Sequence, residues 1–191
     1  MVGVTSGLKS ESVEAHVVAM NFAKALGGKW GHLPAPAFLP VEQAEEVINL
    51  RPVRRTLTRI ESADVVVTSM GPIPENVDAS EITITTEPKM NEKLFELARA
   101  AGAIGEICYG LFDRHGKQVK TTHKGLGLGF EGLRAIAQDP EGEVVLICGG
   151  DRLRFEPLRV ALEAKLASVL VSDTVTARYL VGELDETREV A

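Results

Sequence analysis

The chain has 191 residues, of which 45% are hydrophobic and 25% charged, and its formal net charge is −6 at pH 7. A chain of this length fits one domain with a hydrophobic core of its own. Because binding to phosphate backbones depends on Lys and Arg, an acidic chain is expected to make no direct contact with DNA. The sequence shows neither a signal-peptide pattern nor a run of about 20 apolar residues that could cross a membrane, so we expect a cytoplasmic protein.

In the first half of the chain, short apolar runs alternate with segments whose apolar residues have the spacing of a helix. A strand is expected over residues 1–5 and a helix over 13–26, which Gly27-Gly28 would end because glycine accepts a positive φ. A short strand, two helices and a longer strand are expected next, over residues 30–33, 41–50, 52–63 and 64–70. The β-branched run 64–70 is typical of a strand that is covered on both faces. Residues 72–90 are expected to form an irregular loop.

The second half continues this alternation. The first predicted elements are a helix over 90–101, a hairpin of strands 104–113 and 118–123, a short strand or turn over 126–130 and a helix over 131–138. A strand over 143–148 is followed by a helix with an apolar stripe from Phe155 to Leu166 and by a strand over 168–172. The last predicted helix begins at Asp173 or Thr174 and ends at about Leu184. This order predicts an α/β domain over residues 1–184, with a mostly parallel sheet flanked by helices, and a flexible tail over 185–191.

Three predicted strands end in loops that are suited to ligand binding. In an open α/β sheet, ligands bind beyond the carboxyl ends of the strands, where helix N-termini favour anions. The loops are Thr5-Ser6-Gly7, Ser69-Met70-Gly71 and Gly149-Gly150. Each loop taken alone is better explained as a plain turn, and the third matches neither G-x-G-x-x-G nor the Walker A pattern. Their predicted position at one edge of the sheet is what favours a site.

Five polar side chains near these loops are further candidates. Glu14 and His16 fall on the first predicted helix, and Arg152 and Arg154 follow the third loop, where they could clamp a phosphate. Glu106 interrupts an apolar strand; because an unpaired buried charge is costly, it could accept hydrogen bonds from sugar hydroxyls. The alternatives are an exposed helical face for Glu14 and His16, the solvent face of an edge strand for Glu106, and a solvated helical turn for the arginines.

Motifs for catalysis and metal binding are absent from the sequence. There is no H-E-x-x-H pattern and no G-x-S-x-G nucleophile elbow, and the histidines show no ligand spacing. Cys108 and Cys148 form no C-x-x-C pair and lie in apolar stretches, so we expect two buried free thiols. No catalytic residue, metal or cofactor is therefore expected.

Two blocks of the sequence are specific enough to compare with known families. They are Gly102-Ala103-Ile104-Gly105-Glu106-Ile107 and Val169-Leu170-Val171-Ser172-Asp173 followed by Thr176-Ala177. Shorter matches are Ser6-Gly7-Leu8, Leu33-Pro34-Ala35-Pro36-Ala37-Phe38, Ala63-Asp64-Val65-Val66-Val67, residues 111–116 and 127–133, and Gly149-Gly150. Taken in order, these segments resemble the effector-binding domain of bacterial transcriptional regulators of the SorC/DeoR type, and they cover nearly the whole chain.

The resemblance implies a fold related to ribose-5-phosphate isomerase, glucosamine-6-phosphate deaminase and the CoA-transferases, used for sensing rather than catalysis. It implies binding of a sugar phosphate in this domain and of DNA through a separate helix-turn-helix. Glu106 matches a family acidic residue that contacts the sugar, and Arg154 or Arg152 falls where the family often has a lysine near the ligand. Glu14 and His16 fall where the family helix supplies polar side chains.

The sequence departs from the family pattern at its front. The family domain begins earlier, with a strand and a Gly/Thr-rich phosphate loop, and Thr5 stands where some members carry a basic residue. The loop after Gly71, residues 72–78, lacks the arginines of some members. We therefore expect a domain truncated at its N-terminal end, without a helix-turn-helix. Either its effector is unphosphorylated, or the phosphate site lies mainly in the segment missing from the front.

Three functions follow as hypotheses. The leading one is a sensor for a small sugar or sugar phosphate that forms a homo-oligomer, has no membrane partner and reaches DNA only through a separate domain. The alternative is an enzyme of the isomerase or deaminase type, with Glu106 or Asp173 as general base. The third is a bare oligomerisation module. On the leading hypothesis, Ala at position 106 weakens ligand binding and leaves the fold intact.

Overall fold

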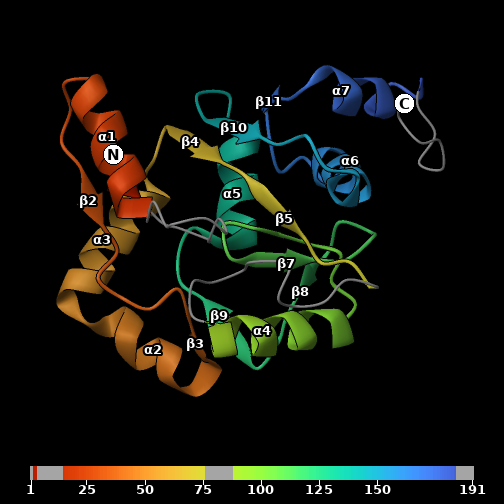
Figure 1. Ribbon diagram of the computed structural model, residues 1–191. Coiled ribbons are helices and arrows are strands. Elements are labelled where there is room, and N and C mark those ends of the chain that lie inside the picture. The colour runs from red at the N-terminus through yellow and green to blue at the C-terminus, as the bar shows by residue number, and fades with distance from the viewer. Residues whose placement is uncertain (1, 4–14, 76–87, 184–191) are drawn as a thin grey trace.

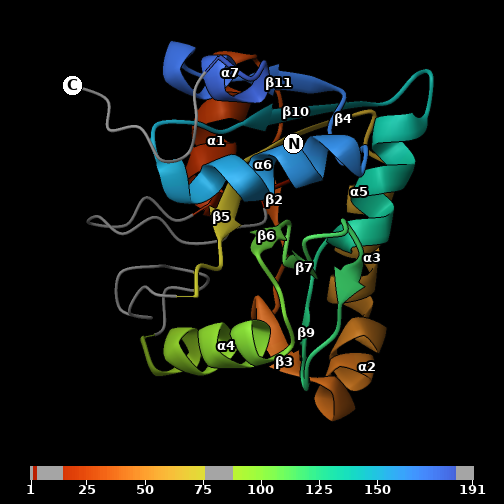
Figure 2. The same ribbon diagram turned by 90° about the vertical axis from the view of Figure 1, so that its right-hand side faces the viewer.

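Three parallel strands form a sheet at one side of the molecule (Figures 1 and 2). The structure, a computed structural model, describes residues 2–3, 15–75 and 88–183. The strands are β4 (Val65–Thr68), β10 (Glu143–Ile147) and β11 (Val169–Val171), in the order β11-β10-β4 (Figure 1). Two helices, α5 (Gly129–Gln138) and α6 (Phe155–Glu163), pack on one face of this sheet (Figure 2). The predicted unit of strand, helix and parallel strand, now β10, α6 and β11, is confirmed.

The two faces of the parallel sheet differ in exposure. Val144 and Leu146 have no exposed surface and pack toward α5 and α6. On the opposite face, the side chains of Val65, Val67 and Ile147 are 55%, 50% and 47% exposed. The prediction that the run 64–70 is covered on both faces is therefore wrong for the described part of the chain. Its apolar face is open to solvent.

A second, antiparallel sheet holds the strands of the predicted hairpin. Its strands are β5 (Met70–Pro72), β6 (Gly105–Ile107), β7 (Gly110–Phe112) and β8 (Gln118–Val119), in that order. The hairpin of β7 and β8 is confirmed. The predicted strand 104–113 is two strands, because the chain reverses at Cys108 and Tyr109, whose φ angles are 49° and 64°. Two consecutive residues in this region are typical of a tight two-residue hairpin turn.

The α/β class is confirmed, but the parallel sheet is smaller than predicted. The run 64–70 bends near Ser69, so that β4 belongs to the parallel sheet and β5 to the antiparallel one. A separate parallel pair joins β1 (Val2–Gly3) to β2 (Gly31–His32), and β3 (Phe38–Pro40) pairs antiparallel with β9 (His123–Gly125). The fold is thus mixed, with both kinds of sheet.

The other helices surround these sheets. They are α1 (Ala15–Ala25), α2 (Val41–Asn49), α3 (Arg51–Glu61), α4 (Pro88–Ala100), α7 (Thr174–Leu180) and the 3-10 helix η1 (Arg152–Arg154). Helix α7 ends before the predicted Leu184, which lies, with the predicted tail, outside the described residues. In the described part of the chain, no helix combines the length and the apolar character needed to cross a membrane.

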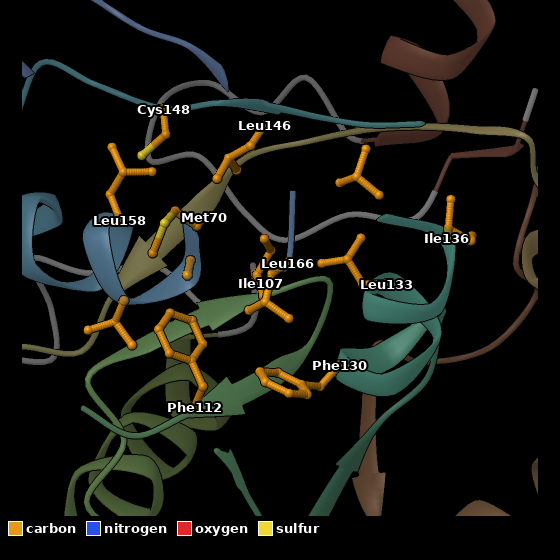
Figure 3. Packing of buried hydrophobic residues seen from close by; sticks show 13 residues of the cluster. Met70, Ile107, Phe112, Phe130, Leu133, Ile136, Leu146, Cys148, Leu158 and Leu166 are labelled. Atoms are coloured by element: carbon orange, nitrogen blue, oxygen red, sulfur yellow. The ribbon is translucent and has the colours of Figure 1, made fainter. Parts of the chain in front are cut away.

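The largest hydrophobic cluster joins the parallel sheet to the β6–β7 hairpin (Figure 3). Phe112 and Phe130 are 0% and 1% exposed, and their ring centroids lie 6.4 Å apart. Phe112 also covers Gly105, its register partner on β6: a Cβ atom built on Gly105 would lie 2.4 Å from the ring. This packing fixes β6, and with it Glu106, against the body of the domain.

His123 on β9 makes stability depend on pH. Its side chain is 9% exposed, and burial lowers its pKa below the ordinary 6.5; nearby Lys93 also lowers the pKa, while Glu42 opposes the shift. The unfolded chain therefore binds a proton at a higher pH than the folded one, and stability falls as pH drops below about 6.5. We expect urea unfolding to show lower stability at pH 5.5 than at pH 7.5. In His123→Gln this pH-dependent difference should shrink; an unchanged difference would contradict the assignment.

Candidate functional site

The carboxyl ends of the parallel strands meet in a group of short loops. After β10, Gly149 and Gly150 lead into η1, and after β11 the chain passes Ser172 and Asp173 into α7. The Asp173 carboxylate accepts a hydrogen bond from the Gly150 N–H at 2.6 Å, and the Ser172 hydroxyl donates to the Cys148 carbonyl at 2.6 Å. These bonds hold the two loops together.

Gly149 is required by this junction. A Cβ atom built there would lie 2.2 Å from the nearer carboxylate oxygen of Asp173 and 3.0 Å from the Ser172 hydroxyl. The glycine therefore allows a close approach of one loop to the other, which explains its presence without any ligand. The Gly-Gly pair thus has a structural role of its own at this edge, since Gly150 also has a positive φ of 78°.

The side chain of Asp173 caps the N-terminus of α7. Its carboxylate accepts from the backbone N–H and the hydroxyl of Thr176, each at 2.9 Å, as well as from Gly150. These hydrogen bonds lower the pKa of Asp173 below its usual value. A general base works best with a pKa near the operating pH, so this geometry disfavours Asp173 in that role.

Glu106 is buried inside the antiparallel sheet. It lies on β6 between β5 and β7, opposite Gly71 and Leu111, and is 2% exposed. The prediction that it occupies the solvent face of an edge strand, the alternative weighed from the sequence, is therefore wrong. Its Oε1 atom accepts from the backbone N–H of Tyr109 at 2.5 Å. Glu106 thus anchors the turn at Cys108 and Tyr109.

The two candidate arginines lie beside β5. Both belong to η1, which contacts β5. Strand β5 pairs with β6, and in this pair Gly71 lies opposite Glu106. Arg152 is exposed, whereas Arg154 is half-buried, and its Nε atom has no hydrogen-bond partner among the described residues. The η1 turn itself is capped by Asp151, whose carboxylate accepts from the Leu153 N–H at 2.9 Å. The structure therefore brings the arginines and Glu106 to the same end of the domain.

A cavity of about 380 Å³ opens next to Arg152. The residues after β5, the residue before β6, the β7–β8 turn and the start of α6 line it; they include Ile73, Glu75, Ile104, Arg114, Phe155 and Glu156. Arg114 and Glu75 form an exposed ion pair at 3.8 Å. Apolar side chains and charges of both signs therefore surround the cavity. Sequence reasoning missed Arg114 and Glu75, because they meet only through the fold.

Neither cysteine is suited to nucleophilic chemistry. Desolvation raises the pKa of the Cys108 thiol to about 12, although its hydrogen bond with Thr68, at 3.3 Å, acts in the opposite direction. Burial also raises the pKa of Cys148, with nearby Arg154 opposing the shift. Both thiols stay protonated near neutral pH, whereas the thiolate is the nucleophile and metal ligand. Among the described residues, no group of three side chains is arranged to hold a metal ion.

The predicted site residues divide into two groups. Ser69, Gly71, Glu106, Gly149, Gly150, Arg152 and Arg154 lie at the carboxyl end of the parallel sheet or on the strands that follow it. Thr5, Ser6, Gly7 and Glu14 lie outside the described residues, and His16 lies on α1 but its side chain is not described. The first group is therefore brought together, while the second remains a prediction.

The sequence matches a family model over residues 1–182, nearly the whole chain, and the family is described as "Putative sugar-binding domain". The chain belongs to this family. The resemblance of its sequence to SorC/DeoR-type regulators is thereby confirmed. No curated protein matches the sequence of this sugar-binding domain.

Solved structures share the fold of this sugar-binding domain. A DeoR family transcriptional regulator from Listeria monocytogenes has a TM-score of 0.73 and 20% identity over 88% of this chain and 65% of its own. The full-length sorbitol operon regulator SorC from Klebsiella pneumoniae has a TM-score of 0.70 and 19% sequence identity. The match covers 87% of this chain and 52% of the regulator. A transcriptional regulator from Streptococcus pneumoniae has a TM-score of 0.72 and 16% sequence identity. That match covers 95% of this chain and 66% of the regulator. The domain thus spans between about half and two thirds of the length of these structures.

Proposed function

We propose that this domain senses a small sugar or sugar phosphate on behalf of a transcriptional regulator of carbohydrate genes. The observation that supports the proposal is that η1, whose Arg152 lines the cavity, contacts β5, the strand on which Gly71 pairs with Glu106, in a domain of a sugar-binding family. DNA binding would fall to a separate helix-turn-helix domain, because this chain has a net charge of −6. Such a regulator would act in the cytoplasm as a homo-oligomer.

Each candidate residue receives a role in this proposal. Glu106 accepts hydrogen bonds from sugar hydroxyls, and Arg152 or Arg154 binds an acidic group. The loops at Ser69 to Gly71 and Gly149 to Gly150 contribute backbone groups at the strand ends. Thr5, Ser6, Gly7, Glu14 and His16 complete the site from the N-terminal side.

Sensing fits these residues better than catalysis. Asp173 is held by hydrogen bonds that lower its pKa, and the pKa values of both thiols are raised. A sensor needs no bond-making group: it needs different affinities in two conformational states, since equal affinity shifts no equilibrium. We therefore propose that the protein is not an enzyme, although its fold would be related to that of ribose-5-phosphate isomerase and glucosamine-6-phosphate deaminase.

A thermal-shift screen tests this function. Pentoses, hexoses, sugar alcohols and their phosphates are added in turn, and hits are measured by calorimetry. A ligand at about 100 times its dissociation constant should stabilise the fold by about 2.7 kcal/mol. We expect a selective hit that is recovered chemically unchanged. Turnover of the hit would favour the enzyme, and no hit in any class would contradict the sensor.

An arginine variant separates the two effector classes. If the effector is phosphorylated, Arg152→Ala should weaken its binding, while the response to its unphosphorylated form should change little. Arg55→Ala on α3 is the matched control, because it removes an exposed guanidinium that does not line the cavity.

A further inference from the structure

Helix α3 presents a basic face to solvent, although the chain as a whole is acidic. Four of its 11 residues are exposed arginines, namely Arg51, Arg54, Arg55 and Arg59. At about 100° per residue, their side chains lie within an arc of about 140° on the helix, opposite the buried Val53, Leu57 and Ile60. With a rise of about 1.5 Å per residue, this arginine face is about 12 Å long.

The arginines are not placed to stabilise the helix that carries them. The first turn of α3 contains no acidic residue, and Arg51 lies there beside the positive end of the helix dipole. Arg55 has a like charge four residues away on each side, at Arg51 and Arg59, and such pairs destabilise a helix. The local stability of α3 therefore does not explain the arginine face, whereas a role in binding does.

The described part of the chain leaves most of the arginine face unpaired. Arg54 donates a hydrogen bond to Asn49 Oδ1 at 2.5 Å. The guanidinium groups of Arg51, Arg55 and Arg59 form no ion pair or hydrogen bond with a described residue. Three positive charges are therefore available to an anionic partner.

We propose that the arginine face binds an acidic segment of another protein. A planar guanidinium binds a carboxylate through two parallel hydrogen bonds, so arginines one helical turn apart match carboxylates with the same spacing on a partner. Leu50, directly before Arg51, is 55% exposed and adds an apolar contact at one end of the face. Arginine is enriched in interfaces between proteins and among the residues that contribute most to their affinity.

A long polyanion such as nucleic acid fits the arginine face less well. Helix α2, which packs against α3, carries three exposed carboxylates, those of Glu42, Glu45 and Glu46. Duplex DNA carries one negative charge about every 1.7 Å, so a contact longer than the face would also meet these carboxylates, in a chain with a net charge of −6. Helix α3 has no aromatic side chain on which a base could stack. A short acidic segment meets the arginines alone.

Fluorescence anisotropy with the full chain tests this surface. The probe is a labelled helical peptide of repeated Glu-Ala-Ala-Gln units, and the control peptide has Gln in place of each Glu. The wild type should bind the Glu peptide more tightly, and less so as the ionic strength rises from about 0.05 M to about 0.5 M, because salt screens exposed charges. Arg55→Glu should weaken binding of the Glu peptide by about fivefold to tenfold, since it replaces an attraction with a repulsion.

A matched variant separates the arginine face from the net charge of the chain. Arg159→Glu makes the same change of charge at an exposed position on α6, which Figure 1 shows on the opposite side of the molecule from α3. This variant should bind the Glu peptide as the wild type does. Circular dichroism spectra of both variants should match that of the wild type, because both side chains are exposed.

Four results would overturn the proposal. Equal binding of the two peptides at low salt would show that the face does not select carboxylates, and equal losses in Arg55→Glu and Arg159→Glu would show an effect of net charge only. Tighter binding of a DNA duplex than of the Glu peptide, lost in Arg55→Glu, would make the face a nucleic-acid contact. A sedimentation mass that falls in Arg55→Glu would place a second copy of the chain there. No arginine of this face lines the cavity, so the effector screen and this experiment fail separately.

Discussion

The Phe112→Ala variant is expected to lose about 3–5 kcal/mol of folding stability, the usual cost of truncating a fully buried phenylalanine. Phe112 has no exposed surface and lies in the cluster that joins the β6–β7 hairpin to α5, α6 and the parallel sheet. Because whole domains are commonly stable by only about 5–15 kcal/mol, this loss is large enough to leave the variant marginally folded. Urea unfolding followed by circular dichroism measures it.

Two further variants make this experiment specific. Leu50→Ala, at a side chain that is 55% exposed, should change stability by less than about 0.5 kcal/mol. Gly105→Ala should itself be destabilising, since the new Cβ meets the Phe112 ring, and it should cost less in a Phe112→Ala background, where that ring is gone. Simple additivity of the two substitutions would show that Phe112 does not cover Gly105 as described.

The sequence predicts most helices and strands because their signals are local. Glycines and apolar spacing place α1 to α4 within about two residues, and the run at 143–148 with its following helix and strand gives the unit of β10, α6 and β11. The reversal at Cys108 and Tyr109 is not predictable in this way. Neither residue is typical of a left-handed turn, and the carboxylate that anchors the turn comes from Glu106. The side chain of Glu106, three residues before Tyr109, holds the turn against the conformational preference of Cys108 and Tyr109.

The open face of the sheet could not be predicted for a related reason. The valines of β4 have the composition of a strand buried on both sides, and composition does not reveal whether a covering element is present. The candidate site shows the same limit. The Gly-Gly and arginine positions follow from the strand order, but the pairing of Arg114 with Glu75 needs the three-dimensional arrangement. The start of α7 at Asp173 or Thr174, by contrast, is predicted from the sequence, because Asp before a helix is a local capping signal.

Glu106 has two roles in these proposals, and a pair of substitutions separates them. Glu106→Ala removes the acceptor of the Tyr109 N–H, a group in a residue that is 7% exposed, and should cost about 1–3 kcal/mol of stability. The sequence-based expectation that Ala leaves the fold intact is therefore revised. Glu106→Gln keeps an oxygen for the turn, so we expect it to retain most of the stability measured by urea unfolding.

Effector binding should weaken in the Glu106→Gln variant even though that variant retains most of its stability. Hydrogen bonds to a charged acceptor are worth about 1.5–3 kcal/mol and neutral ones about 0.5–1.5, so Glu106→Gln should weaken binding of the effector by about tenfold while the fold survives. Glu131→Gln, at an exposed carboxylate on α5, is the control for loss of charge and should bind normally. Calorimetric titration of the effector found by the screen decides the matter. A Gln variant that binds as tightly as the wild type would leave Glu106 as the anchor of a strained turn, and the hydroxyl contacts would then have to come from the strand-end loops.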